Sequence, residues 1–243
     1  MALPYFFVAA IEDKTIVLDE DTSKHVVNVL RMQKGEELLL TNGKGIKAKA
    51  IITDDNRKRC AVKITSSEKE EALGIKTTIG ISLLKNASRF EWFLEKATEI
   101  GVSEIVPLLC ERTEKDKFRF ERLNAILISA MLQSQQCWLP VLHQPTGYAA
   151  FVNSAADDKK RFIAHCEELR KQTLTGELEG NTSDKLMLIG PEGDFTRTEI
   201  ELAINKGFVP VSLGETRLRT ETAGMVAATL LRMCSDGTRS TQM

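Results

Sequence analysis

The stretch LMLIGPEG, residues 186–193, decides how the C-terminal half of this chain is interpreted. A short apolar run is typical of a strand buried in a parallel sheet, and this one leads directly into a turn with two glycines. Ligands of open α/β sheets bind just beyond the carboxyl ends of the strands. Gly190 and Gly193 let backbone groups approach a ligand closely, and Pro191 fixes the turn. The stretch therefore predicts a ligand-binding turn; an ordinary loop, with glycine serving turn geometry alone, is the alternative.

A second glycine-bearing turn, LGETRLR at residues 213–219, lies between an expected strand and the last expected helix. The same two interpretations apply to it, because a glycine turn by itself is a weak functional signal. The fold around the two turns must decide between a ligand-binding role and an ordinary loop.

Strands alternate with helices from residue 75 onward. The expected strands cover residues 77–84, 102–109, 161–165, 185–189 and 209–213. The expected helices cover residues 88–100, 120–135, 196–206 and 220–233. Ser88 with Glu91, and later Thr196 with Glu199, have the spacing of a capping box, and Gly101 ends the first helix. This alternation predicts an α/β domain with a mainly parallel sheet.

The first seventy or so residues are instead rich in short strands. These are expected at residues 5–10, 15–18, 36–41, 46–53 and 59–66. Asn42-Gly43 lies between two of them and is a strong hairpin signal, because its turn needs positive φ. A helix is expected at residues 23–31, with Ser23 as its cap. Several short strands with one helix suggest a small barrel.

A polar stretch at residues 66–72 is the expected linker, since it is charged and poor in core-forming residues. The sequence thus predicts two domains, residues 1–72 and residues 73–243. The tail after residue 235 is polar and expected to fray.

Composition and net charge exclude several classes of protein. The chain has 243 residues and a formal net charge of −1, which argues against a protein that coats nucleic acid non-specifically. No apolar run is long enough to span a membrane, and no basic segment precedes the N-terminal apolar run as it would in a signal peptide. The five cysteines form no C-x-x-C pair, which indicates free thiols in the cytoplasm and no structural metal.

Several familiar active sites are absent from the sequence. It has no P-loop, no G-x-G-x-x-G at the start of the α/β region, no H-x-x-x-H metal spacing and no G-x-S-x-G elbow. The histidines are interpreted as structural or surface residues, with His165 kept open. His165 ends an expected strand and can face the same sheet edge as Gly190.

Taken together, the two glycine turns resemble the C-terminal signature of the 16S rRNA uridine-N3 methyltransferases (RsmE type) of the SPOUT class. The signature reads LIGPEG at residues 188–193, LG at 213–214 and LRTETA at 218–223. Further stretches resemble the same family in the same order: His25 to Gly35, Lys85 with Arg89 to Gly101, and Pro107 to Arg112 with Gln133, Ser134 and Pro140. The resemblance covers nearly the whole chain.

The resemblance implies a PUA-like RNA-binding β-barrel at 1–72, followed by a SPOUT methyltransferase domain at 73–243 with a C-terminal trefoil knot. It also implies a cytoplasmic homodimer in ribosome biogenesis that uses S-adenosyl-L-methionine to methylate N3 of a uridine in 16S rRNA of the small ribosomal subunit. The cofactor-binding residues that it implies are Ile189, Gly190, Pro191, Glu192, Gly193, Leu213, Gly214, Leu218, Arg219 and Thr220.

Two residues after the second turn are the catalytic candidates. Arg219 is placed to orient the base or to balance the negative charge that develops when uridine N3 loses its proton. An ion pair with Glu221 or Glu192 is the structural alternative. Glu221 is the second catalytic candidate, and a helix N-terminal charge is its alternative. Arg31, Arg89 and Arg112 are the expected RNA-binding residues, and no general base is identified.

The sequence departs from the family at a few positions: Asp194 where glycine is frequent, Ser129 and Cys137 where charged residues are expected, and Ile100 for leucine. These changes put fine detail in doubt rather than class. Three rival functions stay open: a SPOUT enzyme acting on another RNA or atom, a non-catalytic RNA-binding assembly factor, and a nucleotide-binding α/β protein.

Overall fold

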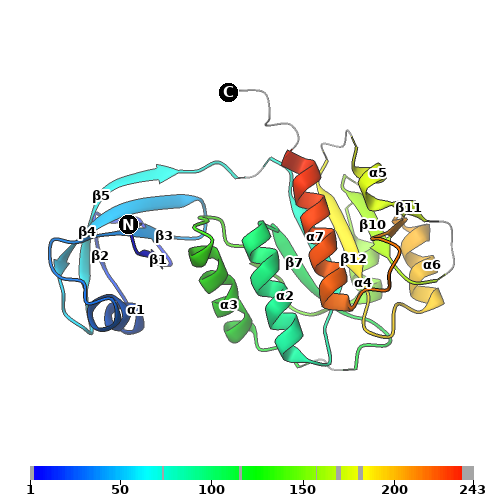
Figure 1. Cartoon of the computed structure of the whole chain (residues 1–243), viewed down its shortest axis with the longest axis horizontal. Helices are drawn as coiled ribbons and strands as arrows, with labels where there is room; N and C mark the ends of the chain where they lie inside the picture. Colours follow the sequence, from blue (N-terminus) through cyan, green and yellow to red (C-terminus); the bar gives the residue numbers. More distant parts are fainter. Residues whose placement is uncertain are drawn as a thin grey trace. The chain divides into compact units, whose positions relative to one another are not determined.

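The computed structural model describes residues 3–72, 74–114, 117–156, 158–167, 171–179 and 183–236. The chain forms two compact units (Figure 1). The first consists of Met1–Ala72 with Met131–Leu139, and the second of Leu73–Ala130 with Pro140–Met243. Residues 131–139, which the sequence analysis assigns to the second domain, thus lie in the first unit. The predicted C-terminal tail lies almost wholly outside the described residues.

The first unit is built on a five-stranded sheet in the order β1-β3-β4-β5-β2. Its strands are β1 (Tyr5–Phe7), β2 (Thr15–Val17), β3 (Glu37–Thr41), β4 (Ile46–Asp54) and β5 (Ala61–Lys69). The predicted hairpin between β3 and β4 is confirmed. The Asn42 carboxamide oxygen accepts from the Lys44 N–H, and Gly43 has φ of 67°. The sheet surrounds a core that includes Val26, Leu38 and Ile52.

Three details of the first unit differ from the sequence prediction. The cap of α1 (Glu20–Lys24) is Asp19, whose carboxylate accepts from the Thr22 N–H, and not Ser23. Ser23 is buried and its hydroxyl is engaged by the neighbouring backbone, at Leu18 and Cys60. The expected helix continues after α1 as a π-helical turn, η1 (His25–Val29). The predicted linker at 66–72 is wrong in its first part, because β5 continues to Lys69 through its pairing with β4.

The second unit contains an eight-stranded sheet in the order β11-β13-β10-β12-β6-β7-β8, with β9 paired to β7. Its strands are β6 (Thr77–Ser82), β7 (Glu104–Leu109), β8 (Val141–Leu142), β9 (Thr146–Gly147), β10 (Lys160–Ala164), β11 (Gln172–Thr173), β12 (Lys185–Ile189) and β13 (Val209–Ser212). Every pairing in this sheet is parallel. The predicted parallel α/β domain is therefore confirmed. The carboxyl ends of all its strands lie at the same edge of the sheet.

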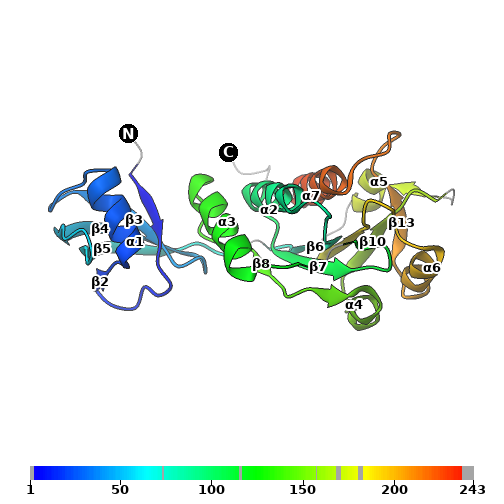
Figure 2. The same ribbon diagram turned by 90° about the horizontal axis from the view of Figure 1, so that it is seen from below.

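Helices cover both faces of this sheet (Figure 2). One face carries α2 (Ala87–Ile100), α5 (Leu174–Leu178) and α7 (Thr220–Asp236); the other carries α4 (Tyr148–Ser154) and α6 (Arg197–Asn205). The helix α3 (Phe120–Gln133) spans residues of both units. None of the helices in the described ranges is long and apolar enough to cross a membrane.

The helix caps were predicted with mixed success. The box of Thr196 with Glu199 is present at α6, and Gly101 ends α2 with φ of 90°. The predicted box at α2 is wrong: Asn86 is the cap and accepts from the Ser88 N–H. Glu91 pairs instead with Arg122 of α3.

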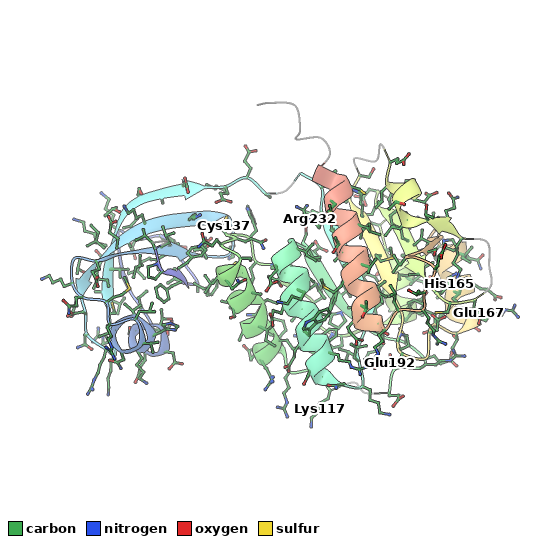
Figure 3. All side chains as sticks on the ribbon, viewed as in Figure 1. Lys117, Cys137, His165, Glu167, Glu192 and Arg232 are labelled. Carbon is green, nitrogen blue, oxygen red and sulfur yellow. The ribbon has the colours of Figure 1, made fainter. Side chains whose placement is uncertain are left out.

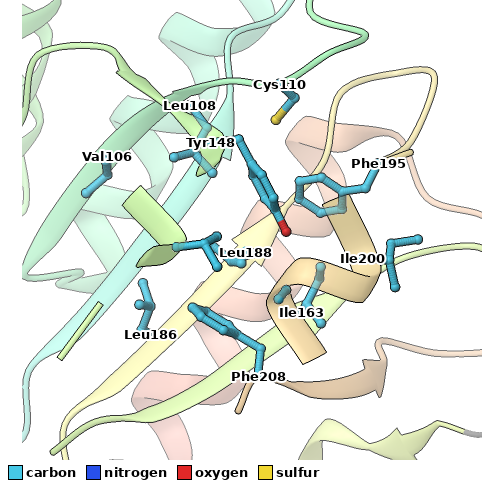
Figure 4. Close-up of a cluster of buried hydrophobic side chains, with 12 residues drawn as sticks. Val106, Leu108, Cys110, Tyr148, Ile163, Leu186, Leu188, Phe195, Ile200 and Phe208 are labelled. Atoms are coloured by element: carbon cyan, nitrogen blue, oxygen red, sulfur yellow. The ribbon is translucent and has the colours of Figure 1, made fainter. Parts of the chain in front are cut away.

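The core beneath α4 and α6 fixes the turn after β12 (Figure 4). Tyr148 and Phe195 lie with their ring centroids 5.1 Å apart, and the Tyr148 hydroxyl donates to the Glu199 carbonyl oxygen at 2.8 Å. Phe195 immediately precedes the α6 cap, so its burial anchors the segment that leaves β12. The chain passes from β12 through α6 to β13, on the far side of β10, and then returns as α7 to pack on α2. The trefoil knot stays a prediction.

Candidate functional site

A cavity of about 650 Å³ opens at the carboxyl ends of β10, β12 and β13. The strand ends are level, since Ala164 pairs with both Ile189 and Val211 in parallel register. The turns that follow these strands therefore meet around one space. The lining residues are Ala164, His165, Cys166, Lys171, Ile189, Gly190, Pro191, Glu192, Asp194, Val211, Ser212, Leu213, Gly214, Glu215, Thr216, Arg217, Leu218, Arg219, Thr220 and Ala223.

Both glycine-bearing turns need glycine for reasons that the structure shows. A Cβ at Gly190 would lie 3.1 Å from the Phe195 backbone nitrogen and from its ring. Gly214 has φ of 139°, a conformation that side chains rarely allow. Gly193 is the exception among the predicted cofactor residues, because it does not line the cavity. Its carbonyl oxygen accepts from Arg112 Nη1 at 2.7 Å.

The comparison with known proteins identifies the fold around this cavity. Residues 70–232 match the RNA methyltransferase domain, and residues 18–65 match the RNA methyltransferase PUA domain. The chain belongs to this RNA methyltransferase family. A curated relative, ribosomal RNA small subunit methyltransferase E of a Synechocystis strain, is 34% identical over 88% of this chain and 72% of its own length.

Solved structures agree with the family assignment. A crystal structure of a probable rRNA-methyltransferase from Porphyromonas gingivalis matches with a TM-score of 0.89 and 40% identity, over 96% of this chain and 99% of that one. Ribosomal RNA small subunit methyltransferase E from Neisseria gonorrhoeae, solved bound to S-adenosyl methionine, matches with a TM-score of 0.86 and 27% identity, covering 96% and 98%. The part of this methyltransferase that matches the PUA domain, residues 18–65, lies within its first unit.

Arg219 is one of the charged residues of the methyltransferase cavity. Its side chain is exposed and lines the cavity. Within the described ranges it makes no ion pair with Glu192 or Glu221, so the structural alternative considered for it is not formed. Glu192 instead accepts from the Lys85 N–H at 3.2 Å.

Glu221 is paired elsewhere. It lies in the first turn of α7, is 7% exposed, and has Oε1 3.6 Å from Nε of Arg89. It does not line the cavity, although its neighbour Thr220 does. The structure thus brings together Arg89 and Glu221, one predicted for RNA and the other for catalysis.

The other predicted RNA-binding arginines lie in different surroundings. Arg112 contacts the backbone of the first glycine turn through Gly193. Arg31 belongs to the first unit, follows η1, is exposed, and has φ of 56°. A positive φ at a bulky residue is uncommon and marks a strained position, which is frequent at functional sites.

His165, whose role the sequence leaves open, lines the cavity; its side chain is labelled in Figure 3. It is 7% exposed, and neither ring nitrogen has a hydrogen-bond partner among the described residues, which leave out 168–170. Burial, and then the positive charge of Lys171, lower the pKa of His165. The imidazole is therefore neutral near pH 7, with one donor and one acceptor available.

Sequence reasoning missed Lys171 and Arg217, which bring positive charge to the rim of the cavity. Lys171 Nζ donates to the His165 carbonyl oxygen at 2.7 Å. Arg217 lies inside the quoted second turn, so its place between Gly214 and Arg219 was a usable signal. Lys171 follows a strand end by several residues, and nothing in its local pattern marks it.

Proposed function

We propose that this protein transfers a methyl group from S-adenosyl-L-methionine to N3 of a uridine in 16S rRNA of the small ribosomal subunit. The observation that carries the proposal is the cavity at the ends of β10, β12 and β13, where two glycine turns meet beside the exposed side chain of Arg219. Family membership supports RNA methylation, and relatives named as small subunit methyltransferases support this RNA as substrate.

The residues present fit S-adenosylmethionine. The cavity of about 650 Å³ is within the range of about 300–1,000 Å³ typical of sites for ligands of this size. The buried ring nitrogens of His165 have no partner among the described residues, as expected where a ligand supplies one. The backbone of Ile189 to Glu192, Leu213, Gly214 and Leu218 to Thr220 would hold the cofactor. When bound, S-adenosylmethionine supplies a methyl group activated by its sulfonium sulfur.

The protein's own contribution is positioning and charge. The three turns fix the cavity on rigid strand ends, which favours an in-line approach of the base. Uridine N3 is a weak nucleophile until its proton leaves, and the charge then spreads over the flanking carbonyl oxygens. Arg219 carries a permanent positive charge and forms no ion pair within the part of the chain that the structure describes, so it can stabilise that charge or orient the base. Glu221 keeps the start of α7, and with it Arg219, in place.

RNA recognition is assigned to surfaces outside the cavity. The PUA-like domain, residues 1–72, is proposed to bind RNA through Arg31, and the methyltransferase domain, residues 73–243, through Arg89 and Arg112. Because the net charge is near neutral, RNA is expected to be bound by local contacts of these arginines and not by a positive electrostatic potential over the whole surface. A cytoplasmic homodimer acting on the small subunit is part of the same proposal.

The test is methyl transfer from labelled S-adenosylmethionine to small ribosomal subunits that lack this modification, followed by nucleoside analysis. The expected product is 3-methyluridine. A different methylated nucleoside would keep the cofactor and overturn the assignment of the substrate atom. Cofactor binding without any transfer to these subunits would favour a non-catalytic assembly factor.

A further inference from the structure

The side chain of Asp194 joins two walls of the cavity. The turn after β10 carries His165 and Cys166, and the turn after β12 carries Gly190 to Asp194. Asp194 Oδ2 accepts from the Cys166 N–H at 2.7 Å, and Oδ1 accepts from the Phe195 N–H at 2.8 Å. One carboxylate therefore holds backbone groups of both turns. Hydrogen bonds to a charged acceptor are among the stronger ones in proteins.

The backbone at Asp194 does not itself require this side chain. Asp194 has φ of 65°, and its N–H closes the turn by donating to the Pro191 carbonyl oxygen at 2.9 Å. Glycine adopts such a conformation without strain, whereas aspartate tolerates it less well. A glycine would keep the turn and lose the link to Cys166. The carboxylate is thus an addition to a turn that could form without it.

The segment that Asp194 holds is the one that carries His165. The His165 carbonyl oxygen accepts from Lys171 Nζ at 2.7 Å, and the next backbone N–H, that of Cys166, donates to Asp194. Both sides of this peptide unit are therefore fixed. The His165 ring is buried and lines the same cavity, and within the described ranges its two nitrogens have no hydrogen-bond partner.

We propose that Asp194 is a positioning residue for cofactor binding, which holds the turn of His165 and Cys166 closed against the turn of Gly190. The inference rests on the proposed function, since it takes S-adenosylmethionine as the ligand. Without the carboxylate, the turn after β10 can move away from the cavity. Binding must then order that turn as well as the ligand, so affinity falls.

Calorimetric titration with S-adenosylmethionine tests the positioning role by comparing the unaltered protein with Asp194→Gly and Asp194→Asn. The control is Glu201→Gln, which removes one negative charge from an exposed site on α6. The expected Kd rises about tenfold for Asp194→Gly and about threefold for Asp194→Asn, whose amide oxygen keeps one acceptor. Glu201→Gln leaves Kd unchanged. Hydrogen exchange at the Cys166 amide is faster in Asp194→Gly, while the thermal midpoint stays near that of the full chain.

The outcomes separate this inference from the proposed function. Failure of the unaltered chain to bind S-adenosylmethionine would overturn the proposed function, and this inference with it. Normal binding by the unaltered chain, together with a Kd within about twofold for both Asp194 variants, overturns the positioning role alone. If Asp194→Gly does not fold, Asp194→Asn provides the comparison, and unchanged affinity there has the same meaning.

Discussion

Arg89 of α2 places its Nε 3.6 Å from Oε1 of Glu221, in the first turn of α7. The Glu221 side chain is 10% exposed and that of Arg89 is 38% exposed. The second Glu221 oxygen is buried and has no hydrogen-bond partner in the described part of the chain. Burying a carboxylate costs folding free energy unless an opposite charge lies nearby. Arg89 supplies that charge, and the N-terminus of α7 adds a favourable dipole. The pair thus joins α2 to the helix that begins beside Arg219.

A double-mutant cycle on Arg89→Met and Glu221→Gln measures this pairing. Arg89→Met is expected to cost about 1–2 kcal/mol of unfolding free energy, because it leaves a covered carboxylate without its partner. The coupling between the two changes is expected to be at least about 0.5 kcal/mol in urea unfolding. Additive effects would mean that the two side chains do not interact in solution.

Gly224 is a point of close approach between α7 and Phe93 of α2. A Cβ at this position would lie 2.7 Å from Phe93 Cε2 and 3.0 Å from Ile81 Cδ1. Gly224→Ala is therefore expected to destabilise the protein by about 1–3 kcal/mol, as overpacking does. Helix propensity alone predicts the opposite sign, a gain of about 1 kcal/mol.

Gly147→Ala is the matched control for Gly224→Ala, since its Cβ meets no atom within 4 Å. Its φ of −60° also suits alanine. Urea unfolding of both variants gives the comparison. A stabilised Gly224→Ala would show that α2 and α7 are packed less closely than described.

Several features that depend on a few consecutive residues were predicted correctly from the sequence, although the equally local box of Ser88 with Glu91 was not. The strand at 185–189 and the capping box of Thr196 with Glu199 both match the structure. Each rests on local apolar pattern or local hydrogen bonding, which sequence shows directly. Ser23 failed as a cap because its hydroxyl is occupied by Leu18 and Cys60, and Cys60 is distant in sequence.

The sequence predicted the two turns of the site but not the contacts between residues far apart in the chain. The two glycine turns were found from sequence, yet nothing in it shows that β13 lies beyond β10, which brings the turns together. The contact of Arg112 with Gly193, and that of Arg89 with Glu221, join residues far apart in the chain. The short helices α4 and α5 were missed because too few residues show a helical period.

Arg112→Met tests whether this arginine serves the cofactor turn or RNA. Arg112 Nη1 donates to the Gly193 carbonyl oxygen at 2.7 Å, and its side chain packs on Gly193. Loss of this support is expected to raise the Kd for S-adenosylmethionine about three- to tenfold, since a charged hydrogen bond is lost from the turn. Cofactor titration and RNA filter binding are measured on the same preparation. Unchanged cofactor affinity together with weakened RNA binding would mean that Arg112 binds RNA and does not support the cofactor turn.

Arg219→Ala is expected to lower kcat for methyl transfer about 100-fold or more, because it removes the charge proposed to stabilise the uracil anion. The Kd for S-adenosylmethionine should change much less, since the cofactor is held mainly by backbone groups. Arg197→Ala, an exposed arginine on α6, is the control and should keep full activity. Single-turnover kinetics on deficient subunits give the comparison, and a kcat within about threefold of the original would remove Arg219 from the reaction.

His165 should make the folded protein sensitive to mild acid. Burial and the charge of Lys171 lower its pKa in the folded state, and these outweigh the opposing charges of Asp194 and Glu167. In the unfolded chain the pKa returns to about 6.5. Between these values the unfolded state binds more protons, so stability falls as pH drops below about 6.5 and is regained as pH rises.

His165→Gln removes this linkage. The unfolding free energy of the unaltered protein relative to His165→Gln is expected to decrease between about pH 7.5 and pH 5.5. NMR titration of the imidazole should give a pKa below about 6.5, and lower still with the cationic cofactor bound beside it. The His143 resonance, from an imidazole of this unit that does not line the cavity, serves as the internal reference for cofactor addition. A His165 pKa at or above 6.5, with parallel pH profiles for the two proteins, would mean that its ring is hydrated rather than buried against the cavity.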